Sequence, residues 1–317
     1  MIHWGIIGAG NIAHRFAESL EQVDEASLLA VANRTQAKAD HFAQQYDVPF
    51  AFAEYQAVLD LPQIDCVYIA LPHAYHFEWI QKAIMAGKAV LCEKPAVLHA
   101  TQLATVIATL DKHPVFFMEA MKNRFVPAYQ AMIDLIQQGA VGEIQYISTS
   151  LRRAMPPETT SYHYLPEQGG CLLDMGIYNI AFMTAFVTER PTIQSLTATT
   201  HENGIETLVE AQLRVNGIDL SLEVGFDQFK PAEAIIRGQL GTITMPDFHR
   251  PTAFMLTHLD GTKQHYEFPY EVDDFYSEIS EVMTCLQTKQ LESSRMTWND
   301  SLRCAEWIDL LKATINK

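Results

Sequence analysis

The chain has 317 residues, of which 48% are hydrophobic and 19% are charged, so its composition is that of a globular protein long enough for two domains. Its formal net charge of −16 argues against binding to nucleic acid, because a phosphate backbone needs a surface rich in lysine and arginine. The sequence contains no recognisable signal peptide and no run of 18 apolar residues, so we expect a cytoplasmic protein that does not bind membranes.

The first 120 residues alternate short β-branched runs with longer amphipathic stretches, which is typical of βαβ units on a parallel sheet. We predict a doubly wound α/β domain over residues 1–120. The predicted strands are Trp4–Gly8, Leu28–Asn33, Asp65–Leu71, Ala89–Glu93 and Val115–Glu119, and the predicted helices are Ile12–Glu21, Gln36–Tyr46, Tyr75–Met85 and Leu98–Leu110.

From Glu143 onward the pattern changes to the alternation of half-buried antiparallel strands, with hairpin signals at Asn216-Gly217 and Asp260-Gly261. We therefore predict a C-terminal α+β domain over residues 121–317, with a large, mostly antiparallel sheet that serves substrate binding and oligomerisation. Helices are predicted near Asp174–Phe186, Asp273–Gln287 and Asn299–Ile315, the last with Asn299 as its N-cap.

The five cysteines are scattered and odd in number, with no C-x-x-C pair and no zinc spacing. This pattern predicts neither a disulfide framework nor a metal site. We expect reduced and mostly buried thiols at Cys66, Cys92, Cys171, Cys285 and Cys304.

A glycine-rich turn follows the first predicted strand and has the form G-x-G-x-x-A, from Gly8 to Ala13. Gly8 permits a tight turn, Gly10 lets the backbone approach a pyrophosphate, and the small Ala13 allows close packing of strand and helix. The N–H groups and dipole of the helix that starts at Asn11 and Ile12 favour an anion. In the first βα turn of a long alternating pattern, this motif predicts a Rossmann fold that binds a dinucleotide.

The end of the second predicted strand indicates which dinucleotide is bound. An NAD site usually has Asp or Glu there, on the ribose 2′-hydroxyl, but this chain has Asn33 and Arg34. An arginine can stack on adenine and hold a 2′-phosphate. The sequence therefore favours NADP, with NAD as the alternative if Arg34 is only a solvated loop charge.

Two further segments follow predicted strands of the parallel sheet, where ligands of open α/β sheets bind. One runs from Leu71 to His76 and the other from Cys92 to Pro95. His73 and His76 have the spacing of a helical metal pair, but no third ligand is apparent, so we favour residues that line the cofactor groove. The cofactor-binding residues predicted in these segments are Leu71, Pro72, His76, Glu93 and Lys94.

The Cys92–Pro95 segment, at its distance from the glycine turn, makes the chain resemble the Gfo/Idh/MocA oxidoreductases over its full length. Within this family the chain is similar to the branch of dimeric dihydrodiol dehydrogenases and NADP-dependent D-xylose dehydrogenases. The segments that carry this similarity are Met118–Met121 leading into Arg124–Pro127, Gly169–Tyr178 and the late Leu291–Ser293.

The resemblance implies that Lys94, Asp174 and Tyr178 meet at the nicotinamide. Asp174 and Tyr178 are four residues apart in a predicted helix, so their side chains are expected on one face. A free tyrosine is a poor base near neutrality, and a nearby lysine cation lowers its pKa. We therefore predict Tyr178 as the proton-transfer residue, Lys94 as its activator and Asp174 as a positioning acceptor. Taken singly, Tyr178 could be a core aromatic and Asp174 an N-cap.

Arg124 is a further candidate, either for anchoring the cofactor or substrate or, as the alternative, for a surface salt bridge. Tyr178 stands where many relatives carry histidine, which points to the dihydrodiol and sugar-oxidising branch. We expect an NADP-dependent dehydrogenase or reductase of a sugar or vicinal diol. The alternatives are a reductase of another small keto compound and a dinucleotide-sensing regulator without turnover. A homodimer or homotetramer through the C-terminal sheet is expected.

Overall fold

The structure is a computed structural model that describes residues 1–155, 161–166 and 168–315. The sequence predicts that second-domain loops such as Arg152–Leu165 wall the substrate pocket, and positions 156–160 of this loop lie outside the described residues. The chain divides into two compact units. The first comprises Met1–Met121 with Glu271–Ser301, and the second comprises Lys122–Tyr270 with the chain from Leu302 onward.

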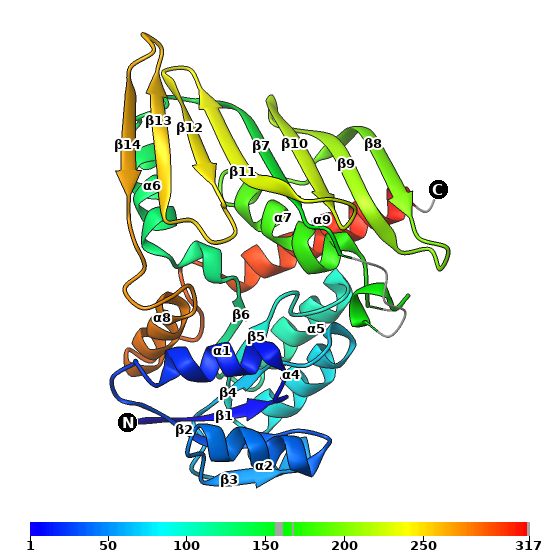
Figure 1. Ribbon diagram of the computed structural model, residues 1–317, viewed down its shortest axis with the longest axis vertical. Coiled ribbons are helices and arrows are strands. Elements are labelled where there is room, and N and C mark those ends of the chain that lie inside the picture. The colour runs from blue at the N-terminus through cyan, green and yellow to red at the C-terminus, as the bar shows by residue number, and fades with distance from the viewer. Residues whose placement is uncertain (156–160, 167, 316–317) are drawn as a thin grey trace. The chain divides into compact units, whose positions relative to one another are not determined.

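The first unit is built on a six-stranded parallel sheet of order β3-β2-β1-β4-β5-β6, which confirms the predicted Rossmann architecture (Figure 1). Its strands are β1 Ile2–Ile7, β2 Ala26–Ala32, β3 Phe50–Phe52, β4 Cys66–Ile69, β5 Ala89–Glu93 and β6 Phe117–Ala120. Its helices are α1 Asn11–Leu20, α2 Gln36–Gln45, α3 Tyr55–Leu59, α4 His76–Met85, α5 Ala100–Leu110 and α8 Tyr276–Gln287, with a 3-10 turn at His73–Tyr75.

The segment 271–301 packs with the first unit, although the predicted ranges place it in the second domain. On α1, Arg15 forms an ion pair with Asp274, and the Ser19 hydroxyl donates to Asp273 at 2.6 Å. Farther along, the backbone N–H of Phe117 donates to the carbonyl of Leu291 at 3.0 Å. These contacts join residues about 170 to 260 positions apart, so local sequence patterns carry no signal for them. The domain ranges 1–120 and 121–317 stay a prediction.

The second unit carries an eight-stranded sheet of order β14-β13-β12-β11-β7-β10-β9-β8, in which only the pairing of β7 with β10 is parallel. The predicted, mostly antiparallel sheet is therefore confirmed. Both predicted hairpins are confirmed as well, because β9 pairs with β10 across Asn216 and Gly217, and β13 pairs with β14 across Gly261, and all three residues have positive φ. The strands are β7 Ile144–Arg152, β8 Thr192–Thr200, β9 Glu206–Val215, β10 Ile218–Gly225, β11 Lys230–Gly238, β12 Gly241–Pro246, β13 Ala253–His258 and β14 Lys263–Glu267.

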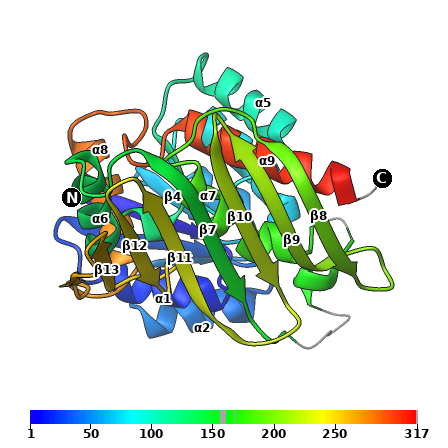
Figure 2. The same cartoon turned by 90° about the horizontal axis from the view of Figure 1, so that it is seen from above.

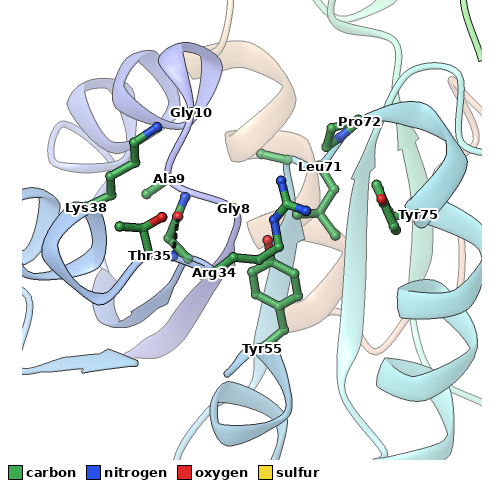
Figure 3. Close-up of a pocket in the computed structure, with 12 residues that line it drawn as sticks. Gly8, Ala9, Gly10, Arg34, Thr35, Lys38, Tyr55, Leu71, Pro72 and Tyr75 are labelled. Carbon is green, nitrogen blue, oxygen red and sulfur yellow. Dashed lines mark hydrogen bonds between the residues drawn. The ribbon is translucent and has the colours of Figure 1, made fainter. Parts of the chain in front are cut away.

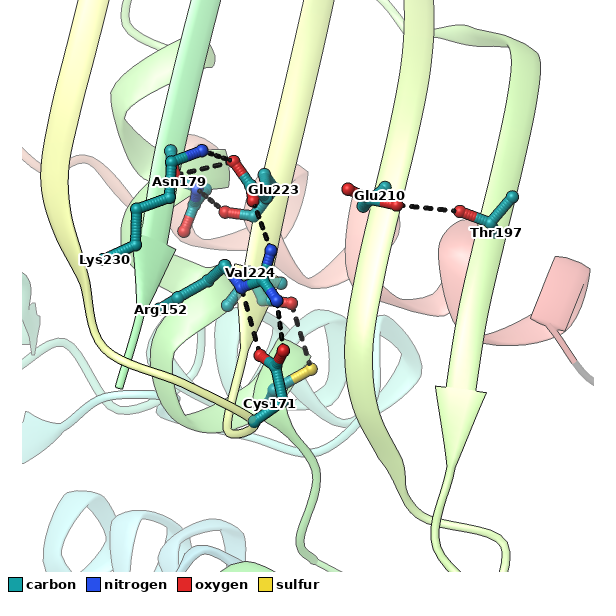
Figure 4. A network of polar contacts seen from close by, with 10 residues as sticks. Arg152, Cys171, Asn179, Thr197, Glu210, Glu223, Val224 and Lys230 are labelled. Carbon is teal, nitrogen blue, oxygen red and sulfur yellow. Dashed lines mark hydrogen bonds and ion pairs between the residues drawn. The ribbon is translucent and has the colours of Figure 1, made fainter. Parts of the chain in front are cut away.

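Helices cover one face of this sheet, as Figure 2 shows for α7 and α9. The side chain of Asn179 on α7 donates to the Thr149 hydroxyl of β7 at 2.9 Å, so Thr149 faces the helices. Arg152 lies three residues after Thr149 in the same strand and therefore points to the opposite, open face. There it pairs with Glu223 and Asp227 (Figure 4). The helices of this unit are α6 Pro127–Gln137, α7 Ile177–Met183 and α9 Trp298–Ile315, with 3-10 turns at Lys122–Arg124 and Tyr162–Tyr164 and a π-helical turn at Leu172–Gly176.

The predicted N-cap of the last helix is wrong. Helix α9 begins at Trp298, so Asn299 lies inside its first turn. Thr297 caps the helix instead, because its hydroxyl accepts the N–H of Asp300 at 3.1 Å while the Asp300 carboxylate accepts the N–H of Thr297 at 3.0 Å. This reciprocal arrangement satisfies two backbone donors at the start of the helix.

The five cysteines are free and buried, as predicted. Among residues 1–155, 161–166 and 168–315, no helix is long and apolar enough to cross a membrane. In the same described part of the chain, no group of three or more histidine, cysteine and acidic side chains could hold a metal ion.

Candidate active site

The glycine turn between β1 and α1 contains two glycines with different requirements. Gly8 has φ of +103°, and a Cβ added there would lie 2.3 Å from the carbonyl oxygen of Ala70. Gly10 is the N-cap of α1 with an ordinary extended φ of −90°, and an added Cβ would meet nothing within 4 Å. The fold therefore requires glycine at position 8 but leaves open space beside position 10, which is where the motif expects a pyrophosphate.

A cavity of about 190 Å³ opens beside this turn (Figure 3). Figure 3 shows the Arg34 guanidinium above the ring of Tyr55, which belongs to the short helix α3. Burial raises the pKa of the Tyr55 phenol, while the charge and hydrogen bonding of Arg34 oppose that increase. Lys38, in the first turn of α2, adds a second cation to the lining.

The lining of this cavity contains six of the residues predicted to bind the cofactor, and no carboxylate occurs among its described lining residues. Thr35 shapes the rim, because its N–H donates to the Asn33 side chain at 3.0 Å and so turns the chain from β2 into α2. The predicted residues in the lining are Gly8, Gly10, Asn33, Arg34, Leu71 and Pro72, and the residues that sequence reasoning missed are Ala9, Thr35, Lys38, Tyr55, Ala70 and Tyr75.

The remaining predicted residues of the glycine motif form the start of α1. Ala13 is fully buried, and its N–H donates to the Gly10 carbonyl at 2.9 Å. Asn11 is exposed and Ile12 half-buried in the same turn. Ala13 thus serves the packing of helix on strand, as the motif predicts.

His76 lies at the start of α4 and has no solvent-accessible surface. Its ring nitrogens lie 2.7 Å from the carbonyl oxygen of Leu71 and 2.8 Å from that of Pro95. Burial lowers the pKa of His76, against the opposing effect of the two carbonyls. The ring therefore ties the Leu71–Pro72 loop to the Lys94–Pro95 turn, and neither nitrogen is available to a metal or to a ligand.

The turn after β5 is held by further contacts within the first unit. The Glu119 carboxylate accepts the N–H of Ala96 at 2.8 Å, and Glu93 accepts the hydroxyl of the buried Tyr68 at 2.5 Å. Burial and the neighbouring Glu93 carboxylate raise the pKa of Tyr68 well above its ordinary value. The backbone turn that carries Lys94 is thus held by contacts on both sides, and the hydrogen bond of Glu93 with Tyr68 is one of these contacts.

In the second unit, Asp174 lies in the π-helical turn that precedes α7, and Tyr178 lies in the first turn of α7. The Tyr178 side chain is 8% exposed. Asp174 faces His163, with 3.6 Å between the Asp174 carboxylate and Nε2 of that ring. The Ser161 hydroxyl lies 2.7 Å from the other ring nitrogen, Nδ1. Sequence reasoning missed His163, since no motif marks the loop that carries it.

The two glycines before this turn position the loop of His163. A Cβ on Gly169 would lie 2.3 Å from the His163 carbonyl oxygen, and the Gly170 N–H donates to that oxygen at 2.9 Å. Gly170 has φ of +107° and lies against the buried carboxylate of Glu206. The glycine pair therefore brings His163 to Asp174 by close backbone contact.

The alternative role of Arg124 as a surface salt bridge is wrong, because the residue is only 3% exposed. Its guanidinium donates to the Ala181 carbonyl at 2.5 Å and to the Thr184 hydroxyl at 3.1 Å. Arg124 thus holds the C-terminal end of α7, the helix that carries Tyr178.

Comparison with known proteins agrees with this architecture. Residues 2–121 match the model of an oxidoreductase family with an NAD-binding Rossmann fold, and residues 129–244 match the GFO/IDH/MocA C-terminal domain. The trans-1,2-dihydrobenzene-1,2-diol dehydrogenase of Xenopus tropicalis is 30% identical over 96% of both chains, and that of Mus musculus is 28% identical over 99% of this chain and 97% of its own.

Two solved structures share the fold. The 3-ketoreductase KijD10 of Actinomadura kijaniata, in complex with NADP and TDP-benzene, has a TM-score of 0.88 at 24% identity over 98% of this chain and 97% of its own. The aldose-aldose oxidoreductase of Caulobacter crescentus has a TM-score of 0.89 at 20% identity over 99% of this chain and 97% of its own. With its glycine turn, its anchored Lys94 turn and both matched domains, this chain belongs to the Gfo/Idh/MocA family of oxidoreductases.

Proposed function

We propose that the protein is an NADP-dependent oxidoreductase that transfers a hydride between the nicotinamide and a hydroxyl-bearing or carbonyl carbon of a sugar or vicinal diol. The observation that carries the cofactor choice is the cavity at the glycine turn, which has Arg34 and Lys38 in its described lining and no carboxylate. An NAD site would place an acid on the ribose, and that acid would repel a 2′-phosphate. KijD10 in complex with NADP supports the same choice.

The test of the cofactor choice is a fluorescence titration of NADPH and NADH against the wild type and Arg34→Ala. A lost hydrogen bond to a charged group costs about 1.5–3 kcal/mol, so NADPH binding should weaken roughly 10- to 100-fold while NADH binding stays nearly unchanged. Lys82→Ala is the control, because Lys82 pairs with Glu78 on the surface of α4. Equal losses for both dinucleotides would contradict the 2′-phosphate site.

The catalytic roles we propose fall on Lys94, Tyr178 and Asp174. The bound nicotinamide supplies the hydride acceptor or donor. During oxidation the Tyr178 phenolate accepts the proton of the substrate hydroxyl, and during reduction the phenol returns it. The Lys94 cation stabilises the phenolate, and Asp174 with His163 orients the groups around the reacting oxygen. The anchored backbone at Lys94 and the packing of Tyr178 in α7 support these roles.

Lys94→Ala and Tyr178→Phe test these roles by separating turnover from cofactor binding. General acid–base catalysis contributes about 10²- to 10⁴-fold, so kcat should fall by that factor while NADPH affinity changes little. Tyr146→Phe is the matched control, because Tyr146 lies under Arg237 in the sheet, away from α7. Full activity of both variants with the true substrate would refute the assignment.

The substrate class rests on the relatives, which are named as dehydrogenases of a dihydrodiol and as an aldose oxidoreductase. A screen of neutral sugars, vicinal diols and dicarbonyls, with both cofactors and in both directions, tests it. Turnover of keto compounds alone would favour the alternative reductase. NADPH binding without any turnover would favour a regulator.

We also propose a homo-oligomer formed through the open face of the eight-stranded sheet, because the helices lie on its other face. Ile235 lies on that open face, since its strand position pairs with Ser148, which lies one residue from the helix-facing Thr149. Light scattering after gel filtration should give a dimer or tetramer for the wild type and a monomer for Ile235→Glu. The cytoplasmic location stays a prediction, which cell fractionation tests.

A further inference from the structure

Two consecutive arginines at the end of β7 point to opposite faces of the sheet. Arg152 lies on the open face with Glu223 and Asp227. Arg153 continues the ladder, since its N–H donates to the Gly225 carbonyl at 2.9 Å, so its side chain has the same alternation as Thr149 and Leu151. Arg153 therefore lies on the face that packs against α7, the helix of Tyr178.

The Arg153 guanidinium contacts His249, with 3.2 Å between Nη2 and Nε2 of the ring. Arginine has only donors, so the guanidinium donates and Nε2 of the ring accepts in this contact. The same ring meets the Tyr178 ring edge-on, with 6.2 Å between centroids. His249 thus contacts both the Arg153 guanidinium and Tyr178, the proposed proton-transfer residue.

The loop that carries His249 is fixed by core packing. Phe248 is fully buried and packs edge-on against Phe182 of α7, with 5.5 Å between ring centroids. The Asn123 side chain lies within 3.5 Å of the Phe248 carbonyl oxygen. Core packing of the neighbouring Phe248 therefore holds His249 on the Tyr178 side of the sheet.

The charge of Arg153 is not neutralised by any carboxylate in residues 1–155, 161–166 and 168–315, since no ion pair involves it there. Besides His249, its guanidinium lies 5.5 Å from the ring centroid of Phe229. The chain has 38 acidic residues against 22 Lys and Arg, and the adjacent Arg152 has two acidic partners. A half-buried guanidinium without an acidic partner can form an ion pair with an anionic ligand.

We propose that Arg153 binds an anionic group, a carboxylate or a phosphate, on the sugar or diol substrate, with its reacting hydroxyl at Tyr178. This inference rests on the proposed function. The planar guanidinium donates two parallel hydrogen bonds that match either anion, which a neutral hydroxyl cannot exploit to the same extent. The substrate class is therefore a hydroxy acid, sugar acid or sugar phosphate, and Arg153 selects it over the neutral compound.

The test compares matched substrates on the full-length enzyme with NADP, followed by NADPH absorbance. The neutral probes are D-glucose and D-xylose, the carboxylates are D-gluconate and D-glucuronate, and the phosphate is D-glucose 6-phosphate. The variants are Arg153→Gln and Arg153→Lys, with Arg237→Gln as control because it removes a guanidinium stacked on Tyr146. A thermal unfolding curve checks that each variant is folded.

We expect kcat/KM of the wild type to be at least tenfold higher for one anionic class than for the neutral sugars. Arg153→Gln should raise KM for that class about 10- to 100-fold with little change in kcat, Arg153→Lys should retain part of the effect, and Arg237→Gln should retain all of it. A higher kcat/KM for the carboxylate probes or for D-glucose 6-phosphate shows which of the two anionic groups Arg153 binds.

Turnover of neutral sugars with equal or better kcat/KM, or equal losses for neutral and anionic probes in Arg153→Gln, would overturn the inference and leave the oxidoreductase function intact. Turnover of no probe in either direction would count against both.

Discussion

The substitution Gly10→Ala separates what the cofactor requires of the glycine turn from what the fold requires. At position 10 the backbone has φ −90° and ψ 179°, which alanine adopts without strain, and the new Cβ meets no protein atom within 4 Å. The loss of a glycine N-cap and the lower entropy of the unfolded chain act in opposite directions, each by about 1 kcal/mol or less. The free energy of unfolding should therefore change by less than ~1 kcal/mol.

Gly8→Ala is the matched control, because its Cβ would overlap the Ala70 carbonyl at 2.3 Å and its φ is +103°. We expect it to destabilise the protein by more than ~3 kcal/mol, because the cost of the strained backbone and the cost of the steric clash are summed. The pair thus predicts opposite outcomes for two glycines of one motif.

The assay is a fluorescence titration of NADPH and NADH together with urea unfolding of the apoprotein. If the pyrophosphate lies against the Gly10 backbone, a methyl group there disrupts charge-assisted hydrogen bonds and weakens both dinucleotides about 10- to 100-fold. Wild-type affinity in Gly10→Ala would refute this placement of the cofactor. An unchanged free energy of unfolding in Gly8→Ala would refute the steric argument.

Three other predictions address the second unit and α9. Thr297→Ala should lower the free energy of unfolding by about 1 kcal/mol in urea, whereas Asn299→Ala should change it by less than ~0.5 kcal/mol, and equal effects would contradict the observed cap. Burial alone would raise the pKa of Glu223, but the hydrogen bonds to its carboxylate lower that pKa from the ordinary 4.5 to about 2. The ionised Glu223 therefore stabilises the folded state above pH 4.5, and this stabilisation is lost as the pH falls toward 2. Glu223→Gln should therefore flatten the unfolding free energy over that acid range, and an unaltered slope would count against it. His163→Asn should lower kcat/KM about tenfold, because Asp174 loses a partner, whereas wild-type kcat/KM would mean that His163 only packs.

The parallel sheet could be predicted from the sequence because its signals are local. The strand Ala89–Glu93 is found with its predicted bounds, and the helix predicted at Gln36–Tyr46 ends one residue earlier, at Gln45. The strand β3 and the helix α3 were missed, since three and five residues are too few for a hydrophobic period. That omission also hid Tyr55, which lies beside Arg34 in the cavity.

The contacts of the site were harder to predict because they join distant positions. His76 was predicted to line the cofactor groove, yet its two carbonyl partners and complete burial make it a clamp between loops. Lys38 lies in the first turn of the helix that follows Arg34, so a cation close to the end of the second strand was the signal that could have found it. No comparable pattern marks His163, which reaches Asp174 only through the backbone contacts of two glycines.

The two sides of the chemistry differ in how tightly the fold constrains them. Steric contact between neighbouring strands constrains the dinucleotide turn, because a Cβ on Gly8 would overlap the Ala70 carbonyl that follows β4. The groups around Tyr178 come instead from the chain that follows β7 and β12, where Arg153 and His249 can change without disturbing the strand pairing. A change of charge at these two positions would alter substrate preference while leaving fold and cofactor intact. A relative that is 30% identical can therefore share the reaction type with this chain and differ in the compound on which it acts.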